Sequence, residues 1–261
     1  MTTWSRAPLR ADRRAAHALQ GEVGAALGRA DAALRALSGR RPPSLSLGGG
    51  TALALRWKHR HSTDVDLFMD FGEGQAFLAA HGAALSKQLA ADPLVGDDVR
   101  TFEQGASWTY LNMAPVSLAP CIIRYPDRHP AIESGTGMPL LPVAQTLHGK
   151  LIGRMLYKGQ MLTRDAYDLA CAPACAPNDL REVAATALAG YPEALADLPH
   201  ALQRLSDSQR VLGRQIIDPR FPEIADNPWR PLAEWAKGVV NPANRNQSPD
   251  PARAPNAKRS A

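Results

Sequence analysis

Residues 46–68, SLGGGTALALRWKHRHSTDVDLF, constrain the fold of this chain more than any other stretch. Residues 44–47 are predicted to form a short strand, and three glycines follow them. Residues 51–58 are predicted to form a helix, and thirteen residues separate the last glycine from the alternating sequence DVDLFM, which is typical of a strand. The expected local structure is therefore strand, glycine turn, helix, loop and strand.

The glycines suit a turn that approaches a ligand. Gly49 and Gly50 have no Cβ, so the backbone there can come close to another group. The helix that follows offers free N–H groups and the positive end of its dipole, which favour a phosphate. Thr51 can cap that helix or donate its hydroxyl to the same phosphate. The alternative is a plain tight turn with no ligand.

Two carboxylates begin the second strand. Asp64 and Asp66 are two residues apart, so on a strand they lie on the same face. They repel each other unless a cation lies between them, and Mg²⁺ prefers such oxygen ligands together with water and substrate phosphates. A solvated pair on an exposed strand is the alternative, but the apolar neighbours Val65, Leu67 and Phe68 favour a buried strand.

The remaining pattern predicts an α+β fold, a mixed-sheet core followed by a helical half. Helices are expected over residues 11–38 and 75–91, antiparallel strands within residues 99–124, and further helices from residue 142 onward. We expect four regions: a basic amphipathic helix at 1–41, the core at 42–140, a helical region at 141–240 that completes a cleft, and a disordered tail at 241–261.

Composition favours a reduced, cytoplasmic protein. The chain has 261 residues, three cysteines and no apolar run long enough for a membrane span, and we see no secretory signal. Its net charge is +5, with an excess of five positive charges in the first 41 residues and three in the last 21. The body between them is therefore net negative. Basic ends suit a polyanion such as RNA, or they serve solubility alone.

Four segments occur in an order that resembles a known family. The string GGGTALALRWKHRHSTDVDLF is similar to the first two motifs of the AbiEii/AbiGii toxins, nucleotidyltransferases of the DNA polymerase-β-like superfamily. LHGKLIGR matches the lysine-bearing helix of that family, and TRDAYDLA matches its R-x-x-D or R-D-x-x-D motif. The resemblance covers residues 44–172, and it implies a polymerase-β-like core.

The resemblance also implies roles for residues. Gly49, Gly50 and Thr51 would hold the triphosphate, and Asp64 and Asp66 would hold Mg²⁺ or Mn²⁺. Further nucleotide contacts would come from Ser62, Lys150, Arg154, Arg164 and Asp165. Ser62 can instead only shape its loop.

Two of these roles have alternatives. Lys150 would neutralise the leaving pyrophosphate, or it is a solvated surface lysine. A third carboxylate usually completes such a site, but the candidate strand VSLAPCII has none. Asp168 or Asp165 would then be the base, unless Asp165 only caps a helix or pairs with Arg164. The missing carboxylate would also fit one metal rather than two.

A run of basic residues lies between the glycines and the aspartates. Its residues could contact phosphates of the nucleotide or of an RNA acceptor; they are Arg56, Lys58, His59, Arg60 and His61.

The leading hypothesis is an Mg²⁺-dependent enzyme that transfers a nucleoside monophosphate from an NTP. By the resemblance it would be a toxin of a toxin–antitoxin or phage-defence system, with RNA or tRNA as acceptor and a cognate antitoxin as partner. One alternative is a degenerate nucleotidyltransferase that binds nucleotide or RNA without chemistry. Another is an enzyme whose acceptor is a protein or a small molecule.

Overall fold

A computed structural model describes residues 32, 44–62, 64–90, 99–104, 109–113, 116–125, 127–134, 137–213 and 215–241. The helix predicted over residues 11–38 falls outside these residues except for Ala32, and the tail predicted from residue 241 does so except for Asn241. Both remain predictions.

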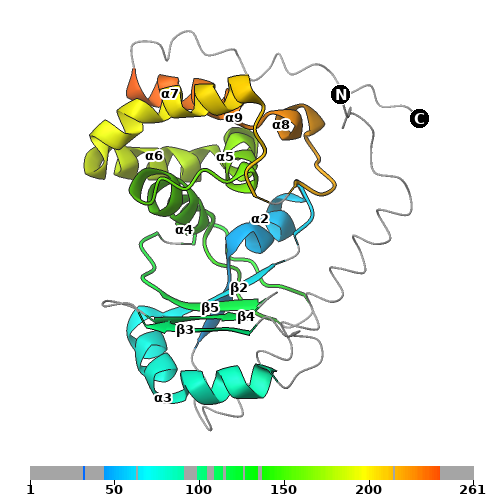
Figure 1. Cartoon of the computed structure of the whole chain (residues 1–261), viewed down its shortest axis with the longest axis vertical. Helices are drawn as coiled ribbons and strands as arrows, with labels where there is room; N and C mark the ends of the chain where they lie inside the picture. The colour runs from blue at the N-terminus through cyan, green and yellow to red at the C-terminus, as the bar shows by residue number, and fades with distance from the viewer. Residues whose placement is uncertain are drawn as a thin grey trace, which may run out of the picture.

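A five-stranded mixed sheet forms one half of the molecule (Figure 1). Its spatial order is β1, β2, β5, β4, β3. β1 is antiparallel to β2, β2 is parallel to β5, and β5, β4 and β3 form the expected antiparallel set. The strands are β1 Leu45–Leu47, β2 Val65–Asp70, β3 Val99–Gln104, β4 Thr109–Met113 and β5 Val116–Cys121.

The two faces of β2 differ in what they contact. Val65, Leu67 and Met69 are almost fully buried in a core that includes apolar residues of α3, Phe71–Ala90. Because side chains alternate along a strand, Asp66 and Phe68 lie on the opposite face, where both are half-buried. The strand thus presents its carboxylate face away from α3.

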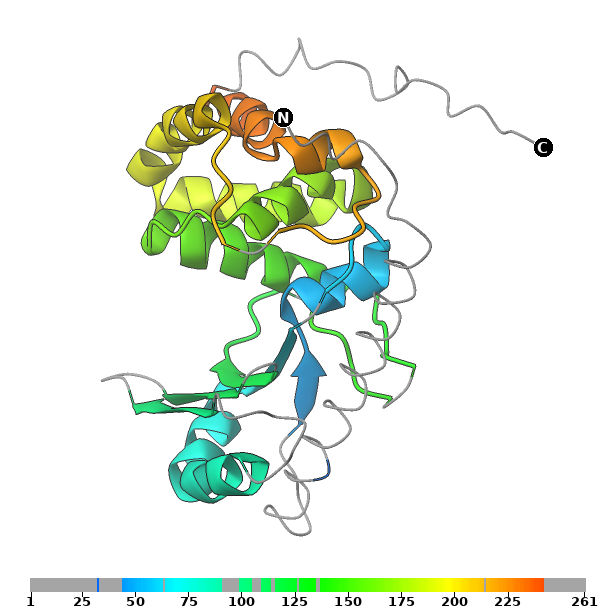
Figure 2. The ribbon, with the colours of Figure 1, turned by 45° about the vertical axis from the view of Figure 1, so that its right-hand side comes forward.

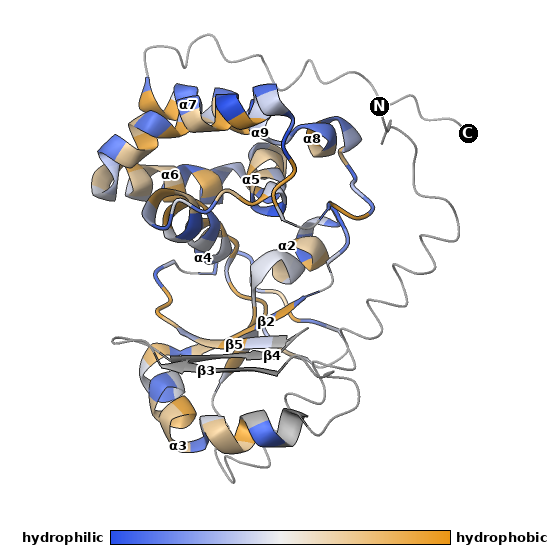
Figure 3. Ribbon diagram, in the orientation of Figure 1, coloured by the Kyte–Doolittle hydropathy of each residue, from blue (hydrophilic) through white to orange (hydrophobic). Residues whose placement is uncertain are grey.

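The second half of the chain is helical, as predicted from residue 142 onward. Its largest apolar core joins α4, η1, α5, α6, α7 and α9 with residues of α2, and the buried Trp229 of α9 is part of it. Orange and blue residues lie side by side along α7 in Figure 3, as expected of an amphipathic helix. The elements are α4 Val143–His148, the π-helix η1 Gly149–Tyr157, α5 Thr163–Cys175, α6 Pro177–Gly190, α7 Pro192–Ser208, α8 Pro222–Asp226 and α9 Trp229–Val240. None of the helices in the described part of the chain is long and apolar enough to cross a membrane.

The helix α2, Gly49–Trp57, lies between the two halves. Figures 1 and 2 show α3 on the far side of the sheet, with α2 and the other helices on the opposite side. α2 contacts β2 as well as α4 and α5. The glycine turn at its start therefore lies where the carboxylate face of the sheet meets the helical half.

Candidate active site

Each of the three glycines at the start of α2 is in close contact with a different side chain. A Cβ added at Gly48 would lie 2.3 Å from the Phe68 ring, and one at Gly49 would lie 1.8 Å from Asp66 Oδ2. One at Gly50 would lie 2.1 Å from a guanidinium nitrogen of Arg60. Gly49 also has φ +60°, a left-handed conformation that favours glycine. The turn is therefore packed against the acidic strand at Gly48 and Gly49 and against Arg60 at Gly50, and a side chain at any of the three positions would displace a neighbour.

The two aspartates lie beside this turn and have different partners. Asp64 Oδ2 accepts two hydrogen bonds from Arg164 of α5, each 3.0 Å long. Asp66 Oδ1 accepts one from Ser117 Oγ at 2.8 Å, and Ser117 is its register partner on the parallel strand β5. Both carboxylates are half-buried, so they keep contact with solvent.

Two hydroxyl groups tie the helix α2 to the loop before β2. Thr51 donates a hydrogen bond to the backbone carbonyl of Asp64, and its Oγ lies 2.8 Å from Ser62 Oγ. Both side chains are buried. Their present contacts hold the loop in place, which is the alternative that the sequence left open for Ser62.

The carboxylate of Asp168 is the centre of a fully buried ion cluster. Arg60 donates to it in bidentate fashion, with Nε at 2.7 Å from Oδ1 and a terminal nitrogen at 2.9 Å from Oδ2. His59 Nε2 lies 2.7 Å from Oδ1, and Lys150 Nζ lies 3.0 Å from Oδ2. These groups are enclosed by protein, so their charges compensate one another rather than a ligand.

Asp165 extends the cluster to the surface. It accepts hydrogen bonds from Lys150 Nζ and, at 2.8 Å, from Arg154. The Arg154 side chain is 43% exposed, whereas that of Lys150 is 7% exposed. Both cations come from the π-helix η1, a type of helix that often occurs at functional sites. Asp165 thus pairs with these two cations, while Arg164 pairs with Asp64.

The pKa shifts follow from these contacts. Burial alone would raise the pKa of Asp168, but the charges of Arg60 and Lys150 hold it well below its ordinary value. Burial would also raise the pKa of Asp165, and Lys150 and Arg154 bring it below its ordinary value. Burial would lower the pKa of Arg154, yet the nearby carboxylates of Asp165 and Asp66 raise it. Both aspartates in α5 are therefore ionised, and Arg154 stays charged beside Asp66.

The basic run at the end of α2 and in the loop after it makes contacts within the protein. His59, Arg60 and His61 are buried, and the Arg56 side chain pairs with Asp127 at 3.1 Å. Lys58 remains exposed. The possible phosphate contacts of this run are therefore corrected for these four side chains. His59 and Arg60 contact Asp168 of α5, whereas Arg56 binds Asp127 and the carbonyl of Leu140.

The sequence did not identify one residue of the site or one of its ion pairs. Ser117 could be found only from the strand register, which the sequence does not give. Arg60 and Asp168 were both named from the sequence, but their pairing was not predicted. A buried carboxylate needs a paired cation, so an acidic residue on the apolar side of TRDAYDLA was a usable signal.

A divalent cation fits the carboxylate pair. In the described residues, no three or more His, Cys, Asp or Glu side chains are grouped to hold a metal. Asp64 and Asp66 are two half-buried oxygen donors beside a turn of bare backbone, and Mg²⁺ commonly uses one or two carboxylates with water and substrate phosphates. The donor set therefore suits an ion that arrives with a phosphorylated substrate.

A family model matches the part of the chain that contains the glycine turn, the carboxylate pair and the arginines of the helical half. It is described as nucleotidyl transferase AbiEii toxin, Type IV TA system, and matches residues 34–234. The chain belongs to the AbiEii family. As an AbiEii protein it is a nucleotidyltransferase by family, and the predicted family and fold class are confirmed.

Two solved structures from Helicobacter pylori are similar to this AbiEii chain. One is a candidate nucleotidyltransferase with 16% identity and a TM-score of 0.44, covering 83% of this chain and 93% of its own. The other is JHP933, with 15% identity and a TM-score of 0.44, covering 85% and 92%. No curated protein matches the chain.

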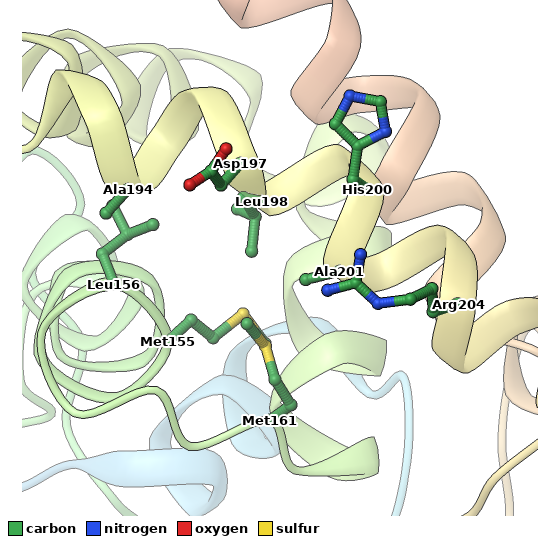
Figure 4. A pocket seen from close by; sticks show the side chains of 9 residues that line it. All are labelled: Met155, Leu156, Met161, Ala194, Asp197, Leu198, His200, Ala201 and Arg204. Atoms are coloured by element: carbon green, nitrogen blue, oxygen red, sulfur yellow. The ribbon is translucent and has the colours of Figure 1, made fainter.

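A separate pocket of about 460 Å³ lies between η1 and α7 (Figure 4). Apolar side chains such as Met155, Met161 and Leu198 line it, with Asp197, His200 and Arg204 of α7. Its lining comes from these helices and the loop at Met161, so it is distinct from the glycine turn and the two aspartates.

Proposed function

We propose that this protein transfers a nucleoside monophosphate from an NTP to a hydroxyl group of an RNA acceptor. In that reaction the acceptor oxygen bonds to the α-phosphorus, the bond to the β-phosphate breaks, pyrophosphate leaves and the acceptor proton passes to solvent. The observation that carries the proposal is the packing of Gly49 against Asp66, which places bare backbone and a carboxylate in direct contact.

We assign separate roles in phosphate and metal binding to the residues of the site. The backbone at Gly49 and Gly50 and the N-terminus of α2 would bind the phosphates, while Asp64 and Asp66 would hold Mg²⁺ or Mn²⁺. When bound, the ion would neutralise charge on the triphosphate. Arg154 and Arg164 have more accessible side chains than Lys150, so we assign them the contacts to the leaving phosphates.

The buried cluster would act by positioning. Lys150 is shared between Asp165 and Asp168, and so it would fix the helix α5 against η1. Asp168 is fully enclosed and has a strongly lowered pKa, which disfavours a role as the base. We therefore propose that Asp168 holds Arg60, His59 and Lys150 in place.

The family description supports a toxin with an antitoxin partner. We propose the cytoplasm as its place of action. Expression of the wild-type chain should arrest growth, and Asp66→Ala should relieve the arrest. If the wild-type protein and Asp66→Ala both arrest growth, the toxicity does not depend on the proposed nucleotide transfer.

The direct test is incubation of the purified protein with Mg²⁺, total RNA and each α-labelled NTP in turn. A doubly substituted Asp64→Ala/Asp66→Ala chain is the control. The proposal predicts label in RNA with the native chain alone, and label in protein would move the acceptor to a side chain.

A second candidate is a module that binds nucleotide without transferring it. The observation in its favour is Ser117, which stands opposite Asp66 on the strand where a third carboxylate is expected. Nucleotide binding by calorimetry with no transfer to any acceptor would support this candidate.

A further inference from the structure

Arg60 connects the glycine turn to the ion cluster on α5. It lies in the loop between α2 and β2, and its side chain is 2% exposed. Besides its bidentate contact with Asp168, it donates a hydrogen bond of 3.0 Å to the carbonyl of His61. The guanidinium is therefore fixed in both position and orientation.

The same guanidinium lies against the backbone of Gly50. A Cβ at that position would be 2.1 Å from one terminal nitrogen of Arg60, 3.2 Å from Cζ and 3.6 Å from the other nitrogen. Gly50 is the second residue of α2, whose N-terminus is the expected phosphate site. A displacement of Arg60 would therefore displace or release the backbone that faces the phosphates.

From Asp168 the contacts continue to the exposed cations. Lys150 contacts both Asp168 and Asp165, and Asp165 contacts Arg154. Arg60 is thus a polar link between the glycine turn and the helical half, where the accessible arginines lie, in addition to the packing of α2 on α4 and α5.

We propose that Arg60 is a positioning residue that sets the glycine turn for nucleotide binding, through Gly50 on one side and Asp168 on the other. This inference rests on the proposed function. The planar fork of arginine makes the bidentate contact with Asp168 while one terminal nitrogen stays against Gly50, and the single ammonium of lysine cannot do both.

The test compares Arg60→Lys with the wild-type protein at a temperature where both are folded. Calorimetry with a non-hydrolysable NTP analogue and Mg²⁺ should show an affinity at least about tenfold weaker for the variant. Mn²⁺ affinity without nucleotide, followed by electron paramagnetic resonance, should stay unchanged, because Arg60 is bonded to Asp168 and to the carbonyl of His61 rather than to Asp64 or Asp66.

Tyr167→Phe is the matched control. The Tyr167 hydroxyl donates to the carbonyl of His59 at 2.9 Å, so its loss disturbs the same loop without touching Gly50. This variant should melt at a lower temperature and bind nucleotide like the wild type. If it loses nucleotide affinity as Arg60→Lys does, the role of Arg60 is merely structural.

Gly50→Ala is a second variant that tests the positioning role of Arg60, and it replaces Arg60→Lys in the test if that variant does not fold. It displaces the guanidinium from the turn while keeping every charge, and it should weaken nucleotide binding with Mn²⁺ affinity unchanged. If Arg60→Lys binds nucleotide as tightly as the wild-type protein, the positioning role is overturned. If Arg60→Lys does not fold, the same result for Gly50→Ala overturns it. Absence of nucleotide binding by the wild-type protein overturns the proposed function itself.

Discussion

Gly49→Ala should abolish most transfer activity while costing little stability. Two effects add at this position. The left-handed φ of +60° would cost about 1–2 kcal/mol for a residue with a Cβ. The new Cβ would also lie 1.8 Å from Asp66 Oδ2, where real contacts stay beyond 3.0 Å, so the carboxylate or the turn must move by more than 1 Å.

The second effect is the one that bears on function. A misplacement of about 1 Å in a catalytic constellation can cost about 10²-fold in rate. We therefore expect the rate of nucleotide transfer to fall about 10²-fold and Mn²⁺ affinity to fall with it, since Asp66 is displaced from Ser117. The melting temperature should drop by only about 3–8 °C.

Gly159→Ala is a control that has the backbone strain of Gly49→Ala without its steric clash. Gly159 has φ +63°, nearly that of Gly49, but a Cβ there would meet nothing within 4 Å. Both variants should lose similar stability, measured by calorimetric melting, and only Gly49→Ala should lose transfer and metal binding. Equal activity in the two variants would refute the claim that the turn and Asp66 form one site.

Three further predictions follow from single contacts. Ser117→Ala should weaken Mn²⁺ binding by about 10–100-fold, because Asp66 loses its orienting donor, and unchanged affinity would contradict this. Arg164→Gln should weaken NTP binding about tenfold in calorimetry without lowering Mn²⁺ affinity, and equal losses of both would contradict the assignment. Folding lowers the pKa of Asp165, so the folded state binds fewer protons than the unfolded state near and below the ordinary value of about 3.9. The melting temperature should therefore fall as the pH drops below about 5. This fall should be steeper for the wild-type protein than for Asp165→Asn, measured by calorimetry.

Local patterns predicted most of the elements near the site. The alternation at residues 64–69 marked β2, and the glycine run marked the turn before α2, because each depends on a few adjacent residues. Helix α3 begins at Phe71, four residues earlier than expected, since Gly72 and Gly74 obscured its start. The side-chain oxygen of Asp70 accepts from the backbone of Gly72 at 3.0 Å and supports that start.

The partners within the site could not be predicted in the same way. Arg164 and Asp64 are 100 residues apart, and Arg60 and Asp168 are 108 apart. Which cation pairs with which carboxylate depends on the packing of α5 against the loop before β2. Asp165 and Arg164 are adjacent in sequence, which suggested that they pair with each other. In the helix, Asp165 instead pairs with Lys150, and Arg164 pairs with Asp64.

The most direct test of the central claim compares α-labelled and γ-labelled NTP in one transfer assay with RNA and Mg²⁺. The account predicts that the α-label enters RNA, that the γ-label is released as pyrophosphate, and that Asp64→Asn and Asp66→Asn each abolish both events. Entry of the γ-label into the acceptor, or transfer that survives both substitutions, would contradict it.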